Sequence, residues 1–132
     1  MGDSEIVNDG ILARVMALQA DYARFVDTRD TKSWGRLFGD HGVLAVGDRE
    51  LTGQLAIAEF GSSSTVGVHI QAVPRVESRI DGRVDATSSF LFVNSATGAL
   101  IAGLYKDELA PAGDGFVFAR RQIDVLARTE VP

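Results

Sequence analysis

The hydrophobic positions of the chain follow two different spacings. Up to about residue 64 they recur at helical intervals except over residues 43–51, and from Thr65 onward they alternate with a period of two. Helices followed by strands are typical of an α+β domain, in which the helices pack against one face of an antiparallel sheet. The pattern therefore predicts the α+β fold class.

A first helix is predicted over residues 9–26, with Asn8 or Asp9 as its N-cap. Its apolar stripe consists of Ile11, Leu12, Val15, Leu18, Tyr22, Phe25 and Val26. An ideal helix advances about 100° per residue, which puts Asp27 about 140° away from Tyr22. A break after Val26 would be needed to bring Asp27 to the side of Tyr22.

Two shorter helices are expected to follow. Asp30 is a suitable N-cap for a helix through Trp34, Leu37 and Phe38 that stops at Gly39. Residues 43–51 provide one or two short strands. Thr52 is the predicted cap of the third helix, which ends in the sequence GSSS.

The second half contains four runs with strand spacing, at residues 65–78, 83–94, 98–109 and 115–127. The links between them are short, so neighbouring strands are expected to be antiparallel and to form a meander. Pro74 cannot donate a hydrogen bond to a neighbouring strand, which indicates a bulge or an edge position.

Composition narrows the classes of function. The 132 residues suit one domain, with residues 1–8 as a loose lead-in. Because the net charge is −5 and the 13 Lys and Arg residues are scattered, we expect no nucleic-acid partner. The chain has no cysteine and no phosphate-binding or dinucleotide motif, and its two histidines are placed differently, so no metal and no cofactor is predicted. No signal sequence or membrane-spanning run is visible, which makes the cytoplasm the expected location.

Tyr22, Asp27 and His69 are the candidates for acid–base chemistry. Tyr22 is either a core aromatic or a hydrogen-bond donor to a substrate oxygen. Asp27 is either a solvated carboxylate or capping residue near a helix end, or a carboxylate that orients a histidine. Strand alternation places His69 opposite an apolar face, which consists of Val66, Val68, Ile70 and Ala72.

That alternation leaves two interpretations of the His69 face. It is exposed to solvent, or it lines a mixed pocket while the apolar face packs against another subunit. The neighbouring Gly67 would leave room for a ligand. We interpret His41 as a surface turn residue, and Asp107 and the pair Arg120-Arg121 as structural charges on the sheet surface.

Four further residues are expected to bind the substrate: Trp34, Phe90, Asn94 and Tyr105.

The order and spacing of several segments resembles the SnoaL-like family of the nuclear transport factor 2 superfamily. These segments are YARFVDTRD, WGRLFGDHGV, VHIQAVPRV, GLYKDEL and GFVFARR. The resemblance covers almost the whole chain and implies a cone-shaped α+β barrel, in which three helices close a curved, mostly antiparallel sheet.

Within that family the chain resembles the branch that contains scytalone dehydratase, bile acid 7α-dehydratase and the lindane dehydrochlorinase. The resemblance implies that Asp27 and His69 act together as the base of an elimination. Tyr22, five residues before Asp27, and Pro74, five after His69, match the bile acid enzyme. Scytalone dehydratase has a second histidine where this chain has Asn94, so scytalone is not the expected substrate.

These observations support two hypotheses. The first is a cofactor-independent dehydratase, other lyase or isomerase that acts on a small apolar, cyclic molecule through a His-Asp dyad. The second is a binding module without catalytic activity, which holds an apolar metabolite or a protein partner. In both cases the apolar outer face of the sheet predicts a homo-oligomer, a dimer or a trimer.

Overall fold

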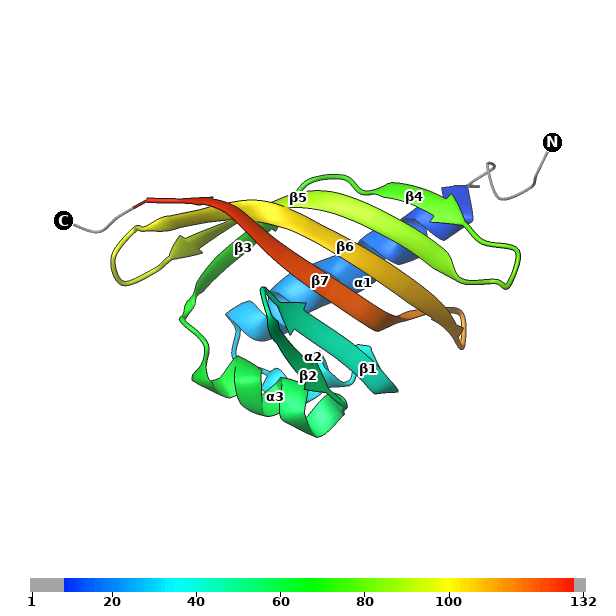
Figure 1. Ribbon diagram of the computed structural model, residues 1–132, viewed down its shortest axis with the longest axis horizontal. Helices are drawn as coiled ribbons and strands as arrows, with labels where there is room; N and C mark the ends of the chain where they lie inside the picture. The colour runs from blue at the N-terminus through cyan, green and yellow to red at the C-terminus, as the bar shows by residue number, and fades with distance from the viewer. Residues whose placement is uncertain (1–8, 130–132) are drawn as a thin grey trace.

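A computed structural model describes residues 9–129 of the chain. The predicted lead-in over residues 1–8 and the cap at Asn8 lie outside the described residues. The predicted α+β class is confirmed: three helices pack against a seven-stranded curved sheet that curls without closing (Figure 1). The strand order is β2-β1-β7-β6-β5-β3, and β4 also pairs with β5.

The helices are α1 (Asp9–Asp27), α2 (Thr31–Gly35) and α3 (Gln54–Ser63). Helix α1 includes Asp27, so no break follows Val26. The helix ends one residue later in a Schellman motif, in which the Arg29 amide donates to the Val26 carbonyl and the Asp30 amide donates to the Phe25 carbonyl. Arg29 occupies the left-handed position of this motif, with φ of 67°.

Helix α2 is shorter than predicted. The predicted cap is confirmed, because the Asp30 carboxylate accepts a hydrogen bond from the Ser33 amide. The extension through Leu37 and Phe38 is wrong, since Phe38 already begins β1 (Phe38–Val46). Phe38 pairs with Phe118 of the last strand and its ring lies 5.0 Å from the Phe118 ring, so burial in the sheet overrides the helical spacing.

The start of α3 differs from the prediction, because the hairpin before it extends one residue further than expected. Strand β2 (Arg49–Thr52) pairs with β1, and Thr52 lies opposite Val43. Thr52 is therefore a strand residue, and Gly53 is the N-cap of α3. His41 is exposed, as expected of a surface residue, but it lies within β1 and not in a tight turn.

The antiparallel meander of the second half is confirmed. The first predicted run is divided into β3 (Gly67–Gln71) and β4 (Arg75–Ser78), which both pair with β5 (Val84–Asn94). Pro74 lies in the gap between them. Strands β6 (Leu100–Ala112) and β7 (Gly115–Arg128) continue the meander, and β7 pairs in parallel with β1.

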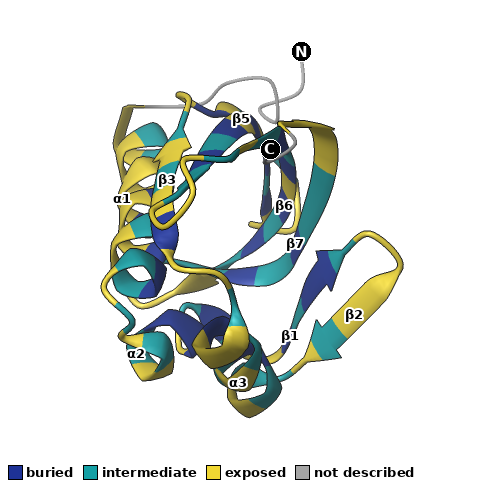
Figure 2. Cartoon of the chain, turned by 90° about the vertical axis from the view of Figure 1, so that its left-hand side faces the viewer, coloured by how far each residue is buried: buried dark blue, intermediate teal, exposed yellow. Residues whose placement is uncertain are grey.

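Figure 2 looks along the curl of the sheet and shows that the buried residues line its inner side, which the helices cover. One stripe of α1 supplies Val15, Leu18, Tyr22 and Val26 to this core. The outer side of the sheet at β3 carries no cover within the described chain: Val66, Val68 and Ile70 are each about half exposed, at 49%, 51% and 55%. The sheet therefore has a polar and aromatic inner face at His69 and an apolar outer face.

Candidate active site

A cavity of about 190 Å³ lies between the helices and the inner face of the sheet. Its walls come from all three helices and from β1, β3, β5, β6 and β7. The lining residues are mostly apolar or aromatic: Tyr22, Val26, Trp34, Val46, Phe60, Ser64, Thr65, His69, Phe90, Phe92, Ile101, Tyr105, Ile123 and Val125. Mainly apolar walls with a few polar groups are typical of small-molecule sites.

His69 and Asp27 form a hydrogen-bonded pair at this cavity. The Nδ1 atom of His69 lies 2.6 Å from Oδ1 of Asp27, and the backbone amide of His69 donates to Oδ2 at 2.9 Å. Both side chains are largely shielded, with 20% and 18% of their surfaces exposed. The carboxylate thus fixes both the ring and the backbone of His69, which lies 42 residues further along the chain.

The ends of two elements bring the pair together. Asp27 is the last residue of α1, where the helix carbonyls make a carboxylate unfavourable. The two hydrogen bonds from His69 compensate for this position. Strand β3 pairs with β5 along one edge only, so the His69 amide is free to donate to Asp27 on the other side.

The electrostatics of the pair favour a neutral imidazole. Burial lowers the pKa of His69, while the hydrogen bond and the charge of Asp27 raise it in partial compensation. Because an ionised carboxylate can only accept a hydrogen bond, the neutral imidazole carries its proton at Nδ1 and donates it to Asp27, which leaves the lone pair at Nε2. Nε2 makes no hydrogen bond to any residue in the described part of the chain, so it is free to accept a proton from a bound molecule.

Tyr22 lies beside the pair and is almost completely buried. Its ring centroid is 6.2 Å from that of His69 and 5.4 Å from that of Trp34. Burial raises the pKa of Tyr22, and Arg121 opposes that rise. The phenol therefore stays protonated at neutral pH and keeps its O–H as a hydrogen-bond donor.

Asp107 and Arg121 are a buried ion pair, not surface charges. Their strands pair them directly, and Arg121 donates from Nε and Nη2 to the two carboxylate oxygens at 2.8 and 3.0 Å. The guanidinium carbon lies 3.6 Å from the centre of the Tyr105 ring and 4.2 Å from that of Tyr22. Burial raises the pKa of Asp107 while the Arg121 charge opposes that rise. Arg120, by contrast, points outward and binds Glu50 at 2.9 Å.

The buried position of this pair was not predicted from the sequence. Strand alternation shows that Asp107 faces the other way from Lys106 and Glu108, and that Arg121 faces the other way from Arg120. It does not show which face of the sheet is inside. Tyr105, which was predicted to line the pocket, lies two residues before Asp107 on the same strand and so shares its face of the sheet. That spacing was the available signal that Asp107 faces inward. A charged pair directly beneath two tyrosines supports both rings at the base of the cavity.

Two predictions about single residues are wrong. Asn94 does not line the cavity, because its Oδ1 accepts hydrogen bonds from the amides of Ala96 and Thr97 in the next turn. Gly67 does not make room for a ligand. A Cβ atom at this position would collide with the Val93 carbonyl and the Phe92 ring, so the missing side chain accommodates Phe92.

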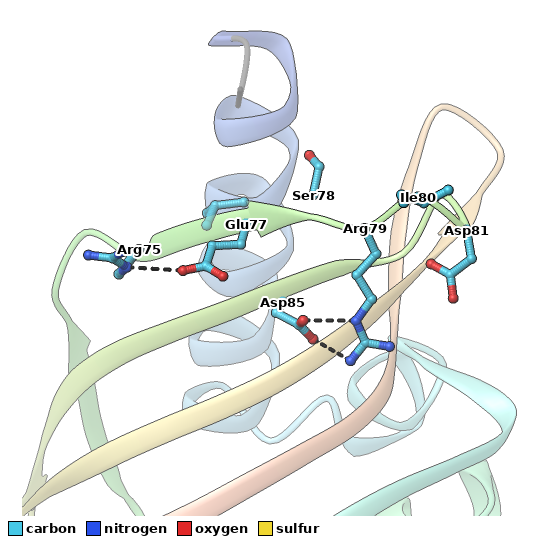
Figure 3. A pocket seen from close by; sticks show the side chains of 8 residues that line it. Arg75, Glu77, Ser78, Arg79, Ile80, Asp81 and Asp85 are labelled. Atoms are coloured by element: carbon cyan, nitrogen blue, oxygen red, sulfur yellow. Dashed lines mark hydrogen bonds and ion pairs between the residues drawn. The ribbon is translucent and has the colours of Figure 1, made fainter. Parts of the chain in front are cut away.

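A larger hollow of about 1000 Å³ lies at the other end of the molecule, along β4 (Figure 3). Four of its five charged residues pair with one another, Arg75 with Glu77 and Arg79 with Asp85. The fifth, Asp81, accepts a hydrogen bond from the Arg83 amide. Arg79 also binds Glu108 at 2.7 Å. Because these charges already have partners and the hollow lacks the mainly apolar walls of the cavity at His69, that cavity is the candidate active site.

Within residues 9–129, no three His, Asp or Glu side chains come together as metal ligands. The helices of this part are too short or too polar to cross a membrane.

Comparison with protein families assigns the chain to a known group. The model of the SnoaL-like domain matches residues 12–122. The chain belongs to the SnoaL-like family. This match includes Asp27, His69 and Tyr22, and it agrees with the resemblance found in the sequence. A comparison with curated proteins finds no match.

Several solved structures share the fold of this SnoaL-like domain. Aln2 from a Streptomyces species has a TM-score of 0.80 and 19% identity, over 92% of this chain and 94% of Aln2. A candidate scytalone dehydratase from Novosphingobium aromaticivorans has a TM-score of 0.78 and 15% identity, over 89% and 85% of the two chains. LinA has a TM-score of 0.79 and 18% identity, over 90% and 88%. At these identities the likeness establishes the fold.

Proposed function

We propose that this SnoaL-like protein is a cofactor-independent acid–base enzyme of the lyase or isomerase type. Its substrate is a small, apolar, cyclic molecule with a proton next to a carbonyl group. The observation that carries the proposal is the 2.6 Å contact between His69 Nδ1 and Asp27 Oδ1 at the wall of an apolar cavity.

In this mechanism Nε2 of His69 removes the proton. Asp27 holds the ring in the tautomer that keeps Nε2 unprotonated, and its negative charge stabilises the imidazolium that forms. Because its pKa is lowered by burial, His69 is neutral and ready to act as a base at pH 7.

Tyr22 is the proposed hydrogen-bond donor to the substrate oxygen. A neutral phenol in a water-poor cavity stabilises the negative charge that develops on a carbonyl oxygen when the neighbouring proton leaves. Trp34, Phe90 and Tyr105 are the proposed apolar contacts of the substrate ring system. The charge of Arg121 beneath Tyr22 and Tyr105 favours the same developing negative charge.

The cavity limits the size of the enclosed part of the substrate. An apolar cavity of about 150 Å³ holds a benzene molecule, and the cavity of about 190 Å³ is only slightly larger. We therefore propose that the reacting ring is enclosed and that any further rings extend through the opening. We also propose that the protein acts in the cytoplasm as a homo-oligomer.

A ligand screen tests this function. Cyclic ketones from the steroid, terpenoid and aromatic polyketide classes would be tested by thermal shift, because a ligand at 100 times its Kd stabilises the native state by about 2.7 kcal/mol. Bound compounds would then be followed for elimination or double-bond migration. Binding and conversion are expected of at least one class. Binding without conversion by any bound compound would favour the binding module instead.

A further inference from the structure

Arg29 is the only non-glycine residue with a positive φ in residues 9–129. It closes the Schellman motif of α1, a position that glycine usually fills because other residues meet a steric penalty there. The chain thus accepts backbone strain two residues after Asp27. Strain of this kind points to a side chain that is needed at that place.

The guanidinium of Arg29 reaches the end of another helix. Its Nη2 donates to the carbonyl of Ser62 at 2.9 Å and to the carbonyl of Ser64 at 3.2 Å, and Nη1 donates to the Ser64 hydroxyl at 3.5 Å. The last carbonyls of a helix have no partners within it and carry partial negative charge. Arg29 therefore fastens the end of α3 to the end of α1.

The fastened segment forms one wall of the cavity and leads to His69. Ser64 and Thr65 line the cavity, and β3 begins two residues later at Gly67. The backbone of Arg29 follows Asp27 closely in the chain, and its guanidinium binds the segment that leads to His69, the partner of Asp27.

We propose that Arg29 is a positioning residue that holds residues 62–65 over the cavity and keeps β3 docked on Asp27. Its planar group contacts three acceptors at once, which neither glycine nor lysine at this position would reproduce. The inference rests on the proposed function only in treating the cavity as the ligand site. The test of Arg29 uses neither substrate nor turnover, so its result does not depend on whether the proposed function is correct.

Trp34 is the single tryptophan of the chain and lines the cavity, which makes its fluorescence a probe of the wall. Acrylamide quenching measures how freely a small molecule reaches it. The second probe is hydrogen exchange of the His69 amide, which donates directly to Asp27. The Tyr105 amide in the middle of the sheet serves as the reference for global opening.

The decisive variant is Arg29→Gly, because glycine relieves the strain at φ of 67° while it removes the guanidinium. We expect at least threefold stronger quenching of Trp34 and at least tenfold faster exchange of the His69 amide, with unchanged exchange at Tyr105. Arg24→Ala is the matched control, since Arg24 is exposed in the last turn of the same helix and makes no side-chain hydrogen bond in the described chain. If R29G matches the wild type in both measurements, Arg29 is only a helix cap and the proposal is wrong.

Discussion

Arg121 and Asp107 form a two-bond ion pair in which neither side chain has any exposed surface. Two tyrosine rings, Tyr105 and Tyr22, lie against the guanidinium. Desolvation of both charges is costly, so the pair stabilises the native state only while both partners are present. Loss of one partner leaves a buried charge without compensation.

The first prediction follows from that burial. Arg121→Met should lower the free energy of unfolding by about 3–5 kcal/mol, because it leaves the Asp107 carboxylate buried and unpaired. Arg120→Met is the control on the adjacent residue, whose exposed ion pair with Glu50 is worth about 0–1 kcal/mol. Urea unfolding measures the free energy of unfolding of both variants and of the wild type. Equal losses in the two variants would show that the Asp107–Arg121 pair is not the buried support described above.

The second prediction concerns the titration of His69. Its pKa, followed by NMR of the ring protons, should lie below the ordinary 6.5. Asp27→Asn should lower it further, since the hydrogen bond and the charge of Asp27 raise it. A pKa above 6.5 in the wild type, or a rise in D27N, would contradict the arrangement of the pair.

The same titration predicts how stability depends on pH. A histidine whose pKa is lower in the folded state binds a proton more readily when unfolded. The stability gained from its neutral form is therefore complete above pH 6.5 and is lost as the pH falls from 6.5 through the folded pKa. Unfolding experiments on the wild type and His69→Gln between pH 7.5 and 5 should show a smaller loss in H69Q.

The third prediction tests the contact between β3 and β5. Gly67→Ala should destabilise the protein by about 1–3 kcal/mol, because the added methyl group must displace Phe92 or the Val93 backbone. Phe92 packs against His69 with 4.6 Å between ring centroids, so the His69 signals should shift as well. Gly39→Ala is the control, since its nearest new contact is an ordinary 3.8 Å. A neutral G67A variant would refute this explanation of Gly67.

The fourth prediction addresses the exposed outer face. Val68 lies opposite Val93, and Ile70 lies opposite Leu91, which forms one apolar surface across β3 and β5. Exposed apolar surfaces of this kind mark interaction sites. We expect a dimer or trimer by sedimentation at micromolar concentration, and monomers for Ile70→Lys. Ile80→Lys, at a fully exposed position between β4 and β5, should leave the oligomer intact. A monomeric wild type would contradict the prediction.

The order of elements could be predicted from the sequence because it depends on local spacing. Helix α1 and the strand meander follow from periodicity, and the chemistry of proline indicated an irregularity at Pro74, where the structure divides the predicted run into β3 and β4. Phe38 was misplaced because its pairing with Phe118 involves residues 80 positions apart, which local spacing does not report. Thr52 was misplaced for a similar reason, since its partner in the hairpin is Val43.

The site was less accessible to prediction from residues alone. Helical spacing placed Asp27 away from Tyr22, and the resemblance to SnoaL-like proteins suggested the pairing with His69. The structure shows why no helix break is required: Asp27 bonds the free edge of β3, while Tyr22 lies on the buried stripe nearby. The inward position of Asp107 and Arg121 depends on the curl of the sheet, which alternation along one strand does not determine.

The most direct test of the proposed function is proton exchange at carbon, because both elimination and isomerisation begin with removal of a proton. A cyclic ketone that binds in the thermal-shift screen would be incubated in D₂O with the wild type, His69→Ala and Asp27→Asn, and deuterium next to the carbonyl would be measured by mass spectrometry. We predict rapid incorporation with the wild type, a loss of about 100-fold or more in H69A and a clear loss in D27N. Incorporation at equal rates in the wild type and H69A would contradict the assignment of His69 as the base.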